Sequence, residues 1–250
     1  AADKATRPLV KQAIQLRAGE ALYRQGKFAD ARVVLGQAAA APAGSRLSGI
    51  AMLRSVQCDF MEGKLAEAKA ALERLQSGVG VASKKDCLRK YWMGRVLAQM
   101  GQGAEAKSQF VSAAAQAKGQ FEEIEQQALV RAAWIEAREK PDALDRLLKD
   151  RDRTKAPAAQ AELFSLAARE SLRQSEKAEG ADKQAAQTMA LFYALRVVEG
   201  FRQSPEALAV SYQVASKGSA ALGDSAGSAR IQEEAKGLSD WMKTPEAAGK

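Results

Sequence analysis

The segment "QGKFADARVVL", Gln25–Leu35, sets a pattern that two later segments repeat: "EGKLAEAKAAL" at Glu62–Leu72 and "MGQGAEAKSQF" at Met100–Phe110. Each copy has a glycine at its second position, an alanine five residues after the glycine, and Leu or Phe four residues after the alanine. The three glycines are 37 and 38 residues apart. A period of this length is typical of stacked helical repeats.

Each recurring letter has a physical role in a pair of helices. A glycine ends the first helix, because it adopts the left-handed conformation without strain. The alanine lies where two helices cross closely, and a larger side chain would not fit there. The Leu or Phe one turn later fills the gap between neighbouring hairpins. We therefore expect Ala31, Ala68 and Ala106 to be buried at helix crossings.

The pattern resembles the tetratricopeptide repeat (TPR), a helix–turn–helix unit of about 34 residues. The first copy matches the family signature at Gly19, Gly26, Phe28, Ala31, Leu35 and Ala38. The third copy matches at Gly94, Leu97, Gly101, Ala106, Phe110 and Ala113. The second copy matches at Gly63, Leu65, Ala68 and Leu72. The first copy lacks the early Trp of the family and offers only Pro42 as its closing Pro, and the copies are about one helical turn too long.

The resemblance implies an all-α fold, a right-handed α-solenoid of about six antiparallel helix hairpins in a single domain spanning residues 1–250. The clearest repeats are expected at 12–48, 49–86, 87–123 and 124–155, and degenerate hairpins at 156–201 and 204–243. Helices are expected near 8–25, 28–41, 46–62, 65–77, 84–101, 104–118, 120–138, 141–150, 156–177, 183–201, 205–221 and 225–242. We expect the last residues, "TPEAAGK", to form a frayed tail.

The composition supports helix and gives an uneven charge. Of the 250 residues 46% are hydrophobic and 6% aromatic, and alanine, the best helix former, is abundant. Residues 1–125 carry 19 basic and 12 acidic residues, whereas 126–250 carry 19 and 18. The basic N-terminal half favours an acidic partner. A solvated lysine-rich face is the simpler alternative.

The residue inventory argues against catalysis. The chain has no histidine, which excludes a His general base, a Ser–His or Cys–His nucleophile and a His-ligated zinc site. Cys58 and Cys87 are predicted to be free thiols, because they lie at opposite ends of neighbouring first helices. Glu122, Glu123, Glu125, Glu136 and Glu139 gather on one expected helix, but no phosphate loop or metal pattern accompanies them. We therefore predict no enzyme, no cofactor and no metal.

In TPR proteins the first helices of the hairpins line the concave face. Carried over to this chain, that face comprises Leu16, Glu20, Tyr23, Arg24, Leu53, Gln57, Phe60, Met61, Tyr91, Arg95 and Gln99. Aromatic residues and arginine anchor interfaces, so this groove suits a helix or an extended peptide. The alternative for its apolar members is packing between hairpins. Leu16 and Glu20 stand where some TPR proteins use Lys and Asn to hold a terminal carboxylate, which disfavours that mode of binding.

We predict a non-enzymatic scaffold or adaptor that binds a partner peptide or helix in the concave groove, within a bacterial cell-envelope complex. One alternative is a nucleic-acid-binding array, because "SKKDCLRKYW", Ser83–Trp92, mixes basic and aromatic residues. Ser83 and Asp86 also resemble a capping pair, which would give this segment a purely structural role. A second alternative is the non-catalytic superhelical module of a cell-wall lytic enzyme.

The expected location follows from the first residues of the chain. "AADKA", Ala1–Ala5, is how a secreted chain looks after cleavage at a small-residue site, which favours the periplasm. A trimmed cytoplasmic chain would look the same. No stretch approaches the roughly 20 apolar residues of a membrane span.

Overall fold

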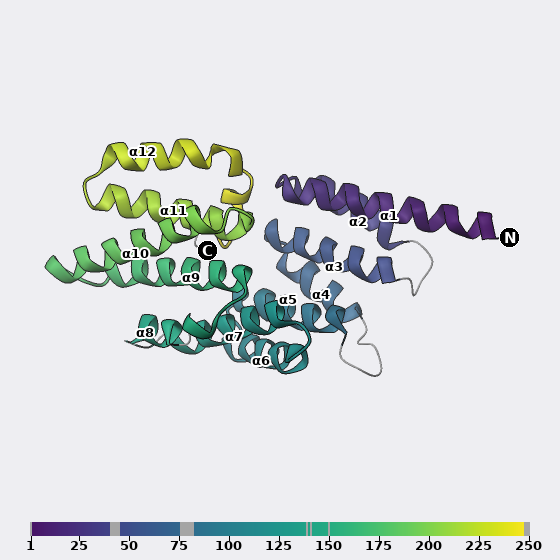
Figure 1. Cartoon of the computed structure of the whole chain (residues 1–250), viewed down its shortest axis with the longest axis horizontal. Helices are drawn as coiled ribbons and strands as arrows, with labels where there is room; N and C mark the ends of the chain where they lie inside the picture. The colour runs from purple at the N-terminus through teal and green to yellow at the C-terminus, as the bar shows by residue number, and fades with distance from the viewer. Residues whose placement is uncertain are drawn as a thin grey trace.

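The computed structural model describes residues 2–40, 46–75, 83–138, 140, 142–149 and 151–247, with side chains except at 2–7, 46 and 143. This part of the chain contains twelve α-helices and no strand (Figure 1). The first six helices are α1 (Ala2–Arg24), α2 (Phe28–Ala39), α3 (Arg46–Met61), α4 (Leu65–Arg74), α5 (Lys84–Gln99) and α6 (Gly103–Ala117). The other six are α7 (Glu122–Ala137), α8 (Ala143–Leu148), α9 (Pro157–Ser175), α10 (Gly180–Gly200), α11 (Pro205–Ala221) and α12 (Ser225–Glu234).

The helices follow one another as hairpins, which confirms the predicted all-α solenoid with a TPR-like repeat. Most helices begin and end within a few residues of the predicted bounds. The expected helix over 225–242 ends at Glu234 and is followed by two 3₁₀ turns, η2 (Ala235–Leu238) and η3 (Trp241–Lys243); a third, η1 (Arg151–Arg153), precedes α9. Figure 1 shows α1–α4 on one side, α9–α12 on the other, and α5–α7 joining them below.

The three repeat glycines have the predicted left-handed conformation. Their φ angles are 77° at Gly26, 75° at Gly63 and 79° at Gly101. After each glycine the next amide donates to a carbonyl five residues back, as Lys27 does to Leu22 at 3.0 Å. This bond satisfies a carbonyl at the end of the first helix and aims the second helix back along it.

The last hairpin contains the same turn, although its sequence departs from the repeat pattern. Gly223 has a φ of 85°, and the amide of Asp224 donates to the carbonyl of Ser219 at 3.0 Å. Ser228, five residues after the glycine, is buried where the clear repeats have alanine. The turn thus identifies α11 and α12 as a repeat hairpin.

The helix crossings are as tight as the repeat pattern predicts. The crossing alanines are fully buried, which confirms the prediction for Ala31, Ala68 and Ala106. The gap-filling side chains are also fully buried: Leu35, Leu72 and Phe110. A Cβ added to Gly94 would lie 2.8 Å from the Phe110 ring, so this helix and its filler touch backbone to side chain.

The two thiols also lie where the sequence puts them. Cys58 on α3 and Cys87 on α5 are free and buried, as predicted. Burial and the neighbouring Asp59 raise the pKa of Cys58 to about 12. Both side chains therefore act as small apolar groups in the core.

The prediction of a frayed C-terminal tail is wrong for the residues that the structure describes. Thr244, Glu246 and Ala247 are buried, and only 248–250 lie outside the described residues. Ala247, the last described residue, is buried in the largest apolar core together with Trp241. The tail is buried because it packs against the hairpins and makes both apolar and ionic contacts with them.

Replacing Gly94 with Ala should lower the free energy of unfolding by about 1–3 kcal/mol, because the new methyl group collides with the fully buried Phe110. Gly36→Ala is the matched control. Gly36 is also inside a helix but has nothing within 4 Å of its added Cβ, so Ala there should stabilise by about 0.5–1 kcal/mol. Urea denaturation followed by circular dichroism measures both. Equal effects of the two substitutions would contradict the assigned helix crossing.

Candidate functional site

The predicted groove residues lie on α1, α3 and α5, and most of them are covered. The buried ones are Leu16, Tyr23, Leu53, Gln57, Phe60, Met61, Tyr91 and Arg95. Glu20 and Gln99 are half-buried, and Arg24 is exposed. Residues 240–247, which we call the C-terminal segment, cover part of this face, because Trp241 packs on Tyr23 and Glu246 pairs with Arg95.

The C-terminal segment begins in an aromatic pocket on the first hairpin. The indole of Trp241 meets the rings of Tyr23 and Phe28 edge-on, with centroids 5.3 and 5.0 Å away. Tyr23 and Phe28 are themselves 5.6 Å apart. The indole N–H donates to the backbone carbonyl of Arg24 at 3.3 Å. Edge-on contacts with two rings and a satisfied N–H make Trp241 an anchor.

The segment then crosses the turns of the first two hairpins. A Cβ on Gly26 would lie 2.9 Å from the Cβ of Asp240, and a Cβ on Gly63 would lie 3.4 Å from Pro245. The side-chain amide of Gln213 on α11 donates to the carbonyl of Met242 at 2.9 Å. The glycines required by the helical turns therefore also leave room for the side chains of the C-terminal segment to pack against these turns.

Glu246 ends the crossing between two arginines. The guanidinium of Arg131 on α7 grips its carboxylate with two parallel bonds, from Nη1 to Oε1 at 3.0 Å and from Nη2 to Oε2 at 3.2 Å. Nη2 of Arg95 on α5 donates to the same Oε2 at 2.6 Å. All three side chains are nearly fully buried. A bidentate arginine–carboxylate pair of this kind fixes both the position and the orientation of the Glu246 carboxylate.

Two more carboxylates and one phenol complete the arrangement. Arg131 Nε also donates to Glu162 on α9, and Arg95 Nη2 to Glu206 on α11. The Tyr91 hydroxyl donates to Glu162 at 2.8 Å. We call the five charged side chains the arginine–glutamate cluster: Arg95, Arg131, Glu162, Glu206 and Glu246.

Burial and the neighbouring charges shift the pKa values of the side chains in the cluster. Burial favours the neutral form of Glu246, but the two arginines outweigh it and hold the pKa of that carboxyl well below its usual range. Burial dominates at Glu206 and raises its pKa despite the neighbouring Arg95. Burial by itself would lower the pKa of both arginines. The neighbouring carboxylates have the larger effect and raise the pKa of Arg95 and Arg131 above the ordinary value of an arginine.

The guanidinium of Arg95 also contacts aromatic rings of the groove. Its central carbon lies 4.3 Å from the Trp92 ring centroid and 4.7 Å from that of Phe60. Stacking on two rings while bonding two carboxylates locks the group in one position. The expectation that Arg95 lies on an accessible surface is therefore wrong: 3% of the residue is exposed, because α11 and the C-terminal segment cover it.

The structure joins some predicted groove residues and separates others. Tyr23, Phe60, Tyr91 and Arg95 all face the C-terminal part of the chain, directly or through one neighbour. The side chain of Arg24 makes no ion pair or hydrogen bond within the described part of the chain. Arg24 contributes its carbonyl instead.

Sequence reasoning missed most of the cluster. Arg131 and Glu162 each interrupt an apolar helical run, "ALVRAAW" and "AAQAELFSLAA", which is the one signal that could have found them. Glu206 reads as an ordinary acidic residue in the first turn of a helix, and Glu246 lies in an unpatterned tail. Their partner Arg95 is 111 and 151 residues away in the chain.

The basic-aromatic segment Ser83–Trp92 has a structural role. The Ser83 hydroxyl accepts from the amide of Asp86 at 3.2 Å and donates to its carboxylate at 2.6 Å, which confirms the capping pair. Tyr91 and Trp92 are buried, so neither ring can stack on a base. This observation disfavours the nucleic-acid alternative at this segment.

Three acidic residues of α7, Glu122, Glu125 and Glu136, also have structural partners. Glu136 is exposed and pairs with Lys107 at 2.8 Å and with Lys140 at 3.8 Å, and these cations lower its pKa. Glu125 accepts from the backbone amide of Gly119 at 3.2 Å, and Glu122 accepts from Gln126. Glu139 lies outside the described residues. Within those residues no group of three or more His, Cys, Asp or Glu side chains could hold a metal ion.

Comparisons with known proteins show a structural likeness but no match in sequence. No family model matches the chain, and no curated protein matches it. The crystal structure of Rap protein complexed with Competence and Sporulation Factor is similar over 95% of this chain and 68% of that chain, with 14% identity and a TM-score of 0.49. A likeness of this degree says nothing about function. No described helix is long and apolar enough to cross a membrane.

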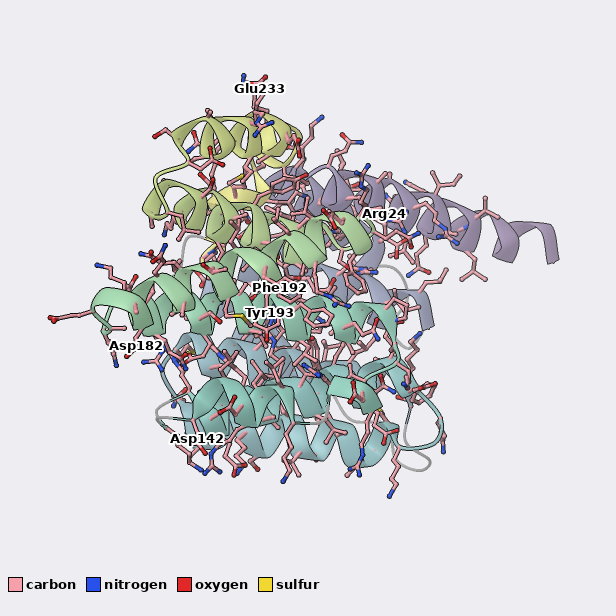
Figure 2. The ribbon with its side chains drawn as sticks, turned by 60° about the vertical axis from the view of Figure 1, so that its left-hand side comes forward. Arg24, Asp142, Asp182, Phe192, Tyr193 and Glu233 are labelled. Carbon is pink, nitrogen blue, oxygen red and sulfur yellow. The ribbon has the colours of Figure 1, made fainter. Side chains whose placement is uncertain are left out.

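Glu246→Gln should lower the free energy of unfolding at neutral pH by about 3–5 kcal/mol, because an amide cannot neutralise the two buried arginines. Glu233→Gln is the matched control: Glu233 is exposed and projects outward from α12 (Figure 2), so its loss should change stability by about 0.5 kcal/mol or less. Urea denaturation measures both. Equal stability of the two variants would show that the cluster does not hold the segment.

Lowering the pH should remove the stabilisation that the ionised carboxylate of Glu246 provides. Because the folded-state pKa of Glu246 lies below its ordinary value of 4.5, the ionised group stabilises fully above that value, and the contribution disappears as the pH falls towards the folded pKa. The raised pKa of Glu206 acts in the opposite direction, so the comparison must be made against a variant. Between neutral pH and about pH 3 the urea midpoint of the wild type should fall more than that of Glu246→Gln. An identical fall in both proteins would contradict the assignment.

Proposed function

We propose that this chain is a non-enzymatic protein-interaction scaffold whose concave face binds a peptide or helical segment of a partner protein. One observation carries the proposal: the face already holds a short segment, the chain's own residues 240–247, which includes the 3₁₀ turn η3. Ring contacts hold one end of this segment and two buried arginines hold the other. Residues that accept such a segment within the chain have the chemistry to accept a similar segment from outside.

The bound segment defines the chemistry that a partner needs. Trp241 fills the aromatic pocket, Pro245 lies over the turn at Gly63, and Glu246 enters the arginine–glutamate cluster. A partner segment therefore needs an aromatic residue, ideally with an N–H or O–H group, and a carboxylate about five residues later. A proline before the carboxylate would restrict the backbone φ angle before binding and so reduce the conformational entropy lost on binding.

A partner must compete with the chain's own segment. Tethering gives that segment an effective concentration in the millimolar range, so it occupies the groove unless the partner binds much more tightly. The excess of basic residues in 1–125 attracts acidic partners and raises their rate of encounter at low salt. The occupied groove thus favours a strong acidic competitor over weak non-specific ligands.

A labelled peptide of residues 239–247, Ser-Asp-Trp-Met-Lys-Thr-Pro-Glu-Ala, tests the proposal. Fluorescence polarisation measures its binding to the full chain and to the Trp241→Ala/Glu246→Gln variant. In the variant the internal segment loses both anchors while the groove keeps Tyr23, Arg95 and Arg131. We expect the peptide to bind the variant at least about tenfold more tightly than the wild type, since the internal competitor is weakened.

Two controls identify the contacts. Lys243→Ala changes an exposed residue of the segment and leaves both anchors, so this variant should bind the peptide as weakly as the wild type does. A peptide with Ala and Gln in place of Trp and Glu should not bind the double variant. Circular dichroism checks that the variants stay helical, and Trp241→Ala alone serves if the double variant unfolds. Failure of a folded variant to bind the peptide would overturn the proposal.

A further inference from the structure

A separate pocket of about 230 Å³ lies between α7, α9 and α11. Each of the three helices contributes two side chains that are four residues apart and so share a helix face. These pairs are Trp134 and Arg138 on α7, Arg169 and Arg173 on α9, and Gln213 and Lys217 on α11. Three helix faces that converge on one hollow make a site on rigid elements rather than on loops.

The wall of the pocket has more cations than anions. Four basic side chains line it, against two acidic ones, Glu170 and Glu176. Arg173 is already paired with Glu170, at 2.9 and 2.5 Å. Arg138, Arg169 and Lys217 make no ion pair within the part of the chain that the structure describes. The wall therefore offers uncompensated positive charge.

Arg169 is the central cation of this wall. Its guanidinium carbon lies 5.8 Å from the Trp134 ring centroid, and that of Arg138 lies 5.2 Å from the same ring. Burial lowers the pKa of Arg169; the distant attraction of Glu246 offsets this in part, and repulsion from Arg131 adds to it. A half-buried guanidinium with no bonded carboxylate and with cationic neighbours is stabilised by an anion.

The rest of the pocket is apolar. Leu172, Val210, Val214 and Ala247 line it together with the Trp134 ring. Such a lining favours the burial of a small hydrocarbon or aromatic group. The pocket thus combines an apolar floor with two arginines that can form paired bonds to one anionic group.

We infer that this pocket binds a small organic anion: a carboxylate or phosphate group joined to a compact apolar body. The anionic group bonds Arg169 and Arg138, with Lys217 at the open side, and the apolar body lies against Trp134 and the floor. This site is distinct from the proposed peptide groove. The two sites meet at Ala247, the end of the C-terminal segment, and at Gln213, whose side-chain amide bonds the carbonyl of Met242.

Isothermal titration calorimetry on the full chain tests the inference with four probes. Benzoate and phenyl phosphate carry both features, inorganic phosphate carries only the charge, and benzamide has the shape of benzoate without the charge. We expect the two aromatic anions to bind, and the tighter of them tells whether carboxylate or phosphate is preferred. Benzamide should bind at least about tenfold more weakly than benzoate, because it lacks the charge-assisted bonds. Inorganic phosphate should also bind more weakly than phenyl phosphate, because it leaves the floor unfilled.

Substitutions locate the binding. Arg169→Gln should raise the Kd of the better probe by about tenfold to a hundredfold. The double change Arg138→Gln/Lys217→Gln affects exposed side chains only, so it keeps the test valid even if Arg169→Gln perturbs the fold. Arg202→Gln, an exposed arginine outside the pocket, is the matched control and should leave the Kd unchanged.

Three results would overturn the inference. The first is that neither aromatic anion binds the wild type. The second is that benzamide binds as tightly as benzoate, which would indicate a merely apolar hollow. The third is that the folded pocket variants bind like Arg202→Gln, which would place the anion elsewhere.

Discussion

The packing of the C-terminal segment on the helical hairpins, which we call the closed form, depends on two buried guanidinium groups, those of Arg95 and Arg131. A buried charge must be paired, because removing it from water costs far more than the fold can otherwise offset. Three carboxylates meet this requirement, and they come from α9, α11 and the C-terminal segment. The arginines therefore hold together parts of the chain that the helical repeat would leave separate.

This closure makes the protein different from an ideal solenoid. In a regular array each repeat contacts only its neighbours, so stability is nearly a sum of local terms. Here Trp241 packs on the first hairpin, and Glu246 joins α5 to α7. The last residues of the described chain thus tie the first hairpin to the fourth. Unfolding of one half should expose the ionic core of the other, which favours cooperative behaviour.

The packing of the C-terminal segment also affects whether the groove can bind a partner. Tyr23 on α1 packs on Trp241 and Arg95 on α5 pairs with Glu246, so the chain's own segment already occupies part of the groove. Access to the groove depends on whether that segment leaves. The pocket around Arg169 lies between α7, α9 and α11, and its anion binding is proposed separately from that of the groove.

The site could be predicted from the sequence only in part. Tyr23, Phe60, Tyr91 and Arg95 follow from the repeat register, because residues one period apart recur on the same side of successive hairpins. The burial of these residues does not follow, since it depends on a tail that carries no periodic pattern. Glu246 could not be assigned from sequence, because its partners are set by how the distant halves of the chain meet.

The sequence by itself determined the helices, their hairpin turns and their closest crossings. Gly26, Gly63 and Gly101 end helices through a local backbone preference, and the small or large residues that follow set how closely two neighbouring helices approach. Only the tertiary structure decided that the concave face is filled, and that charges from five separate segments form one cluster. The reason is physical: helix ends and crossings depend on residues within one repeat, whereas the pairing of buried charges depends on where the whole array brings its two ends.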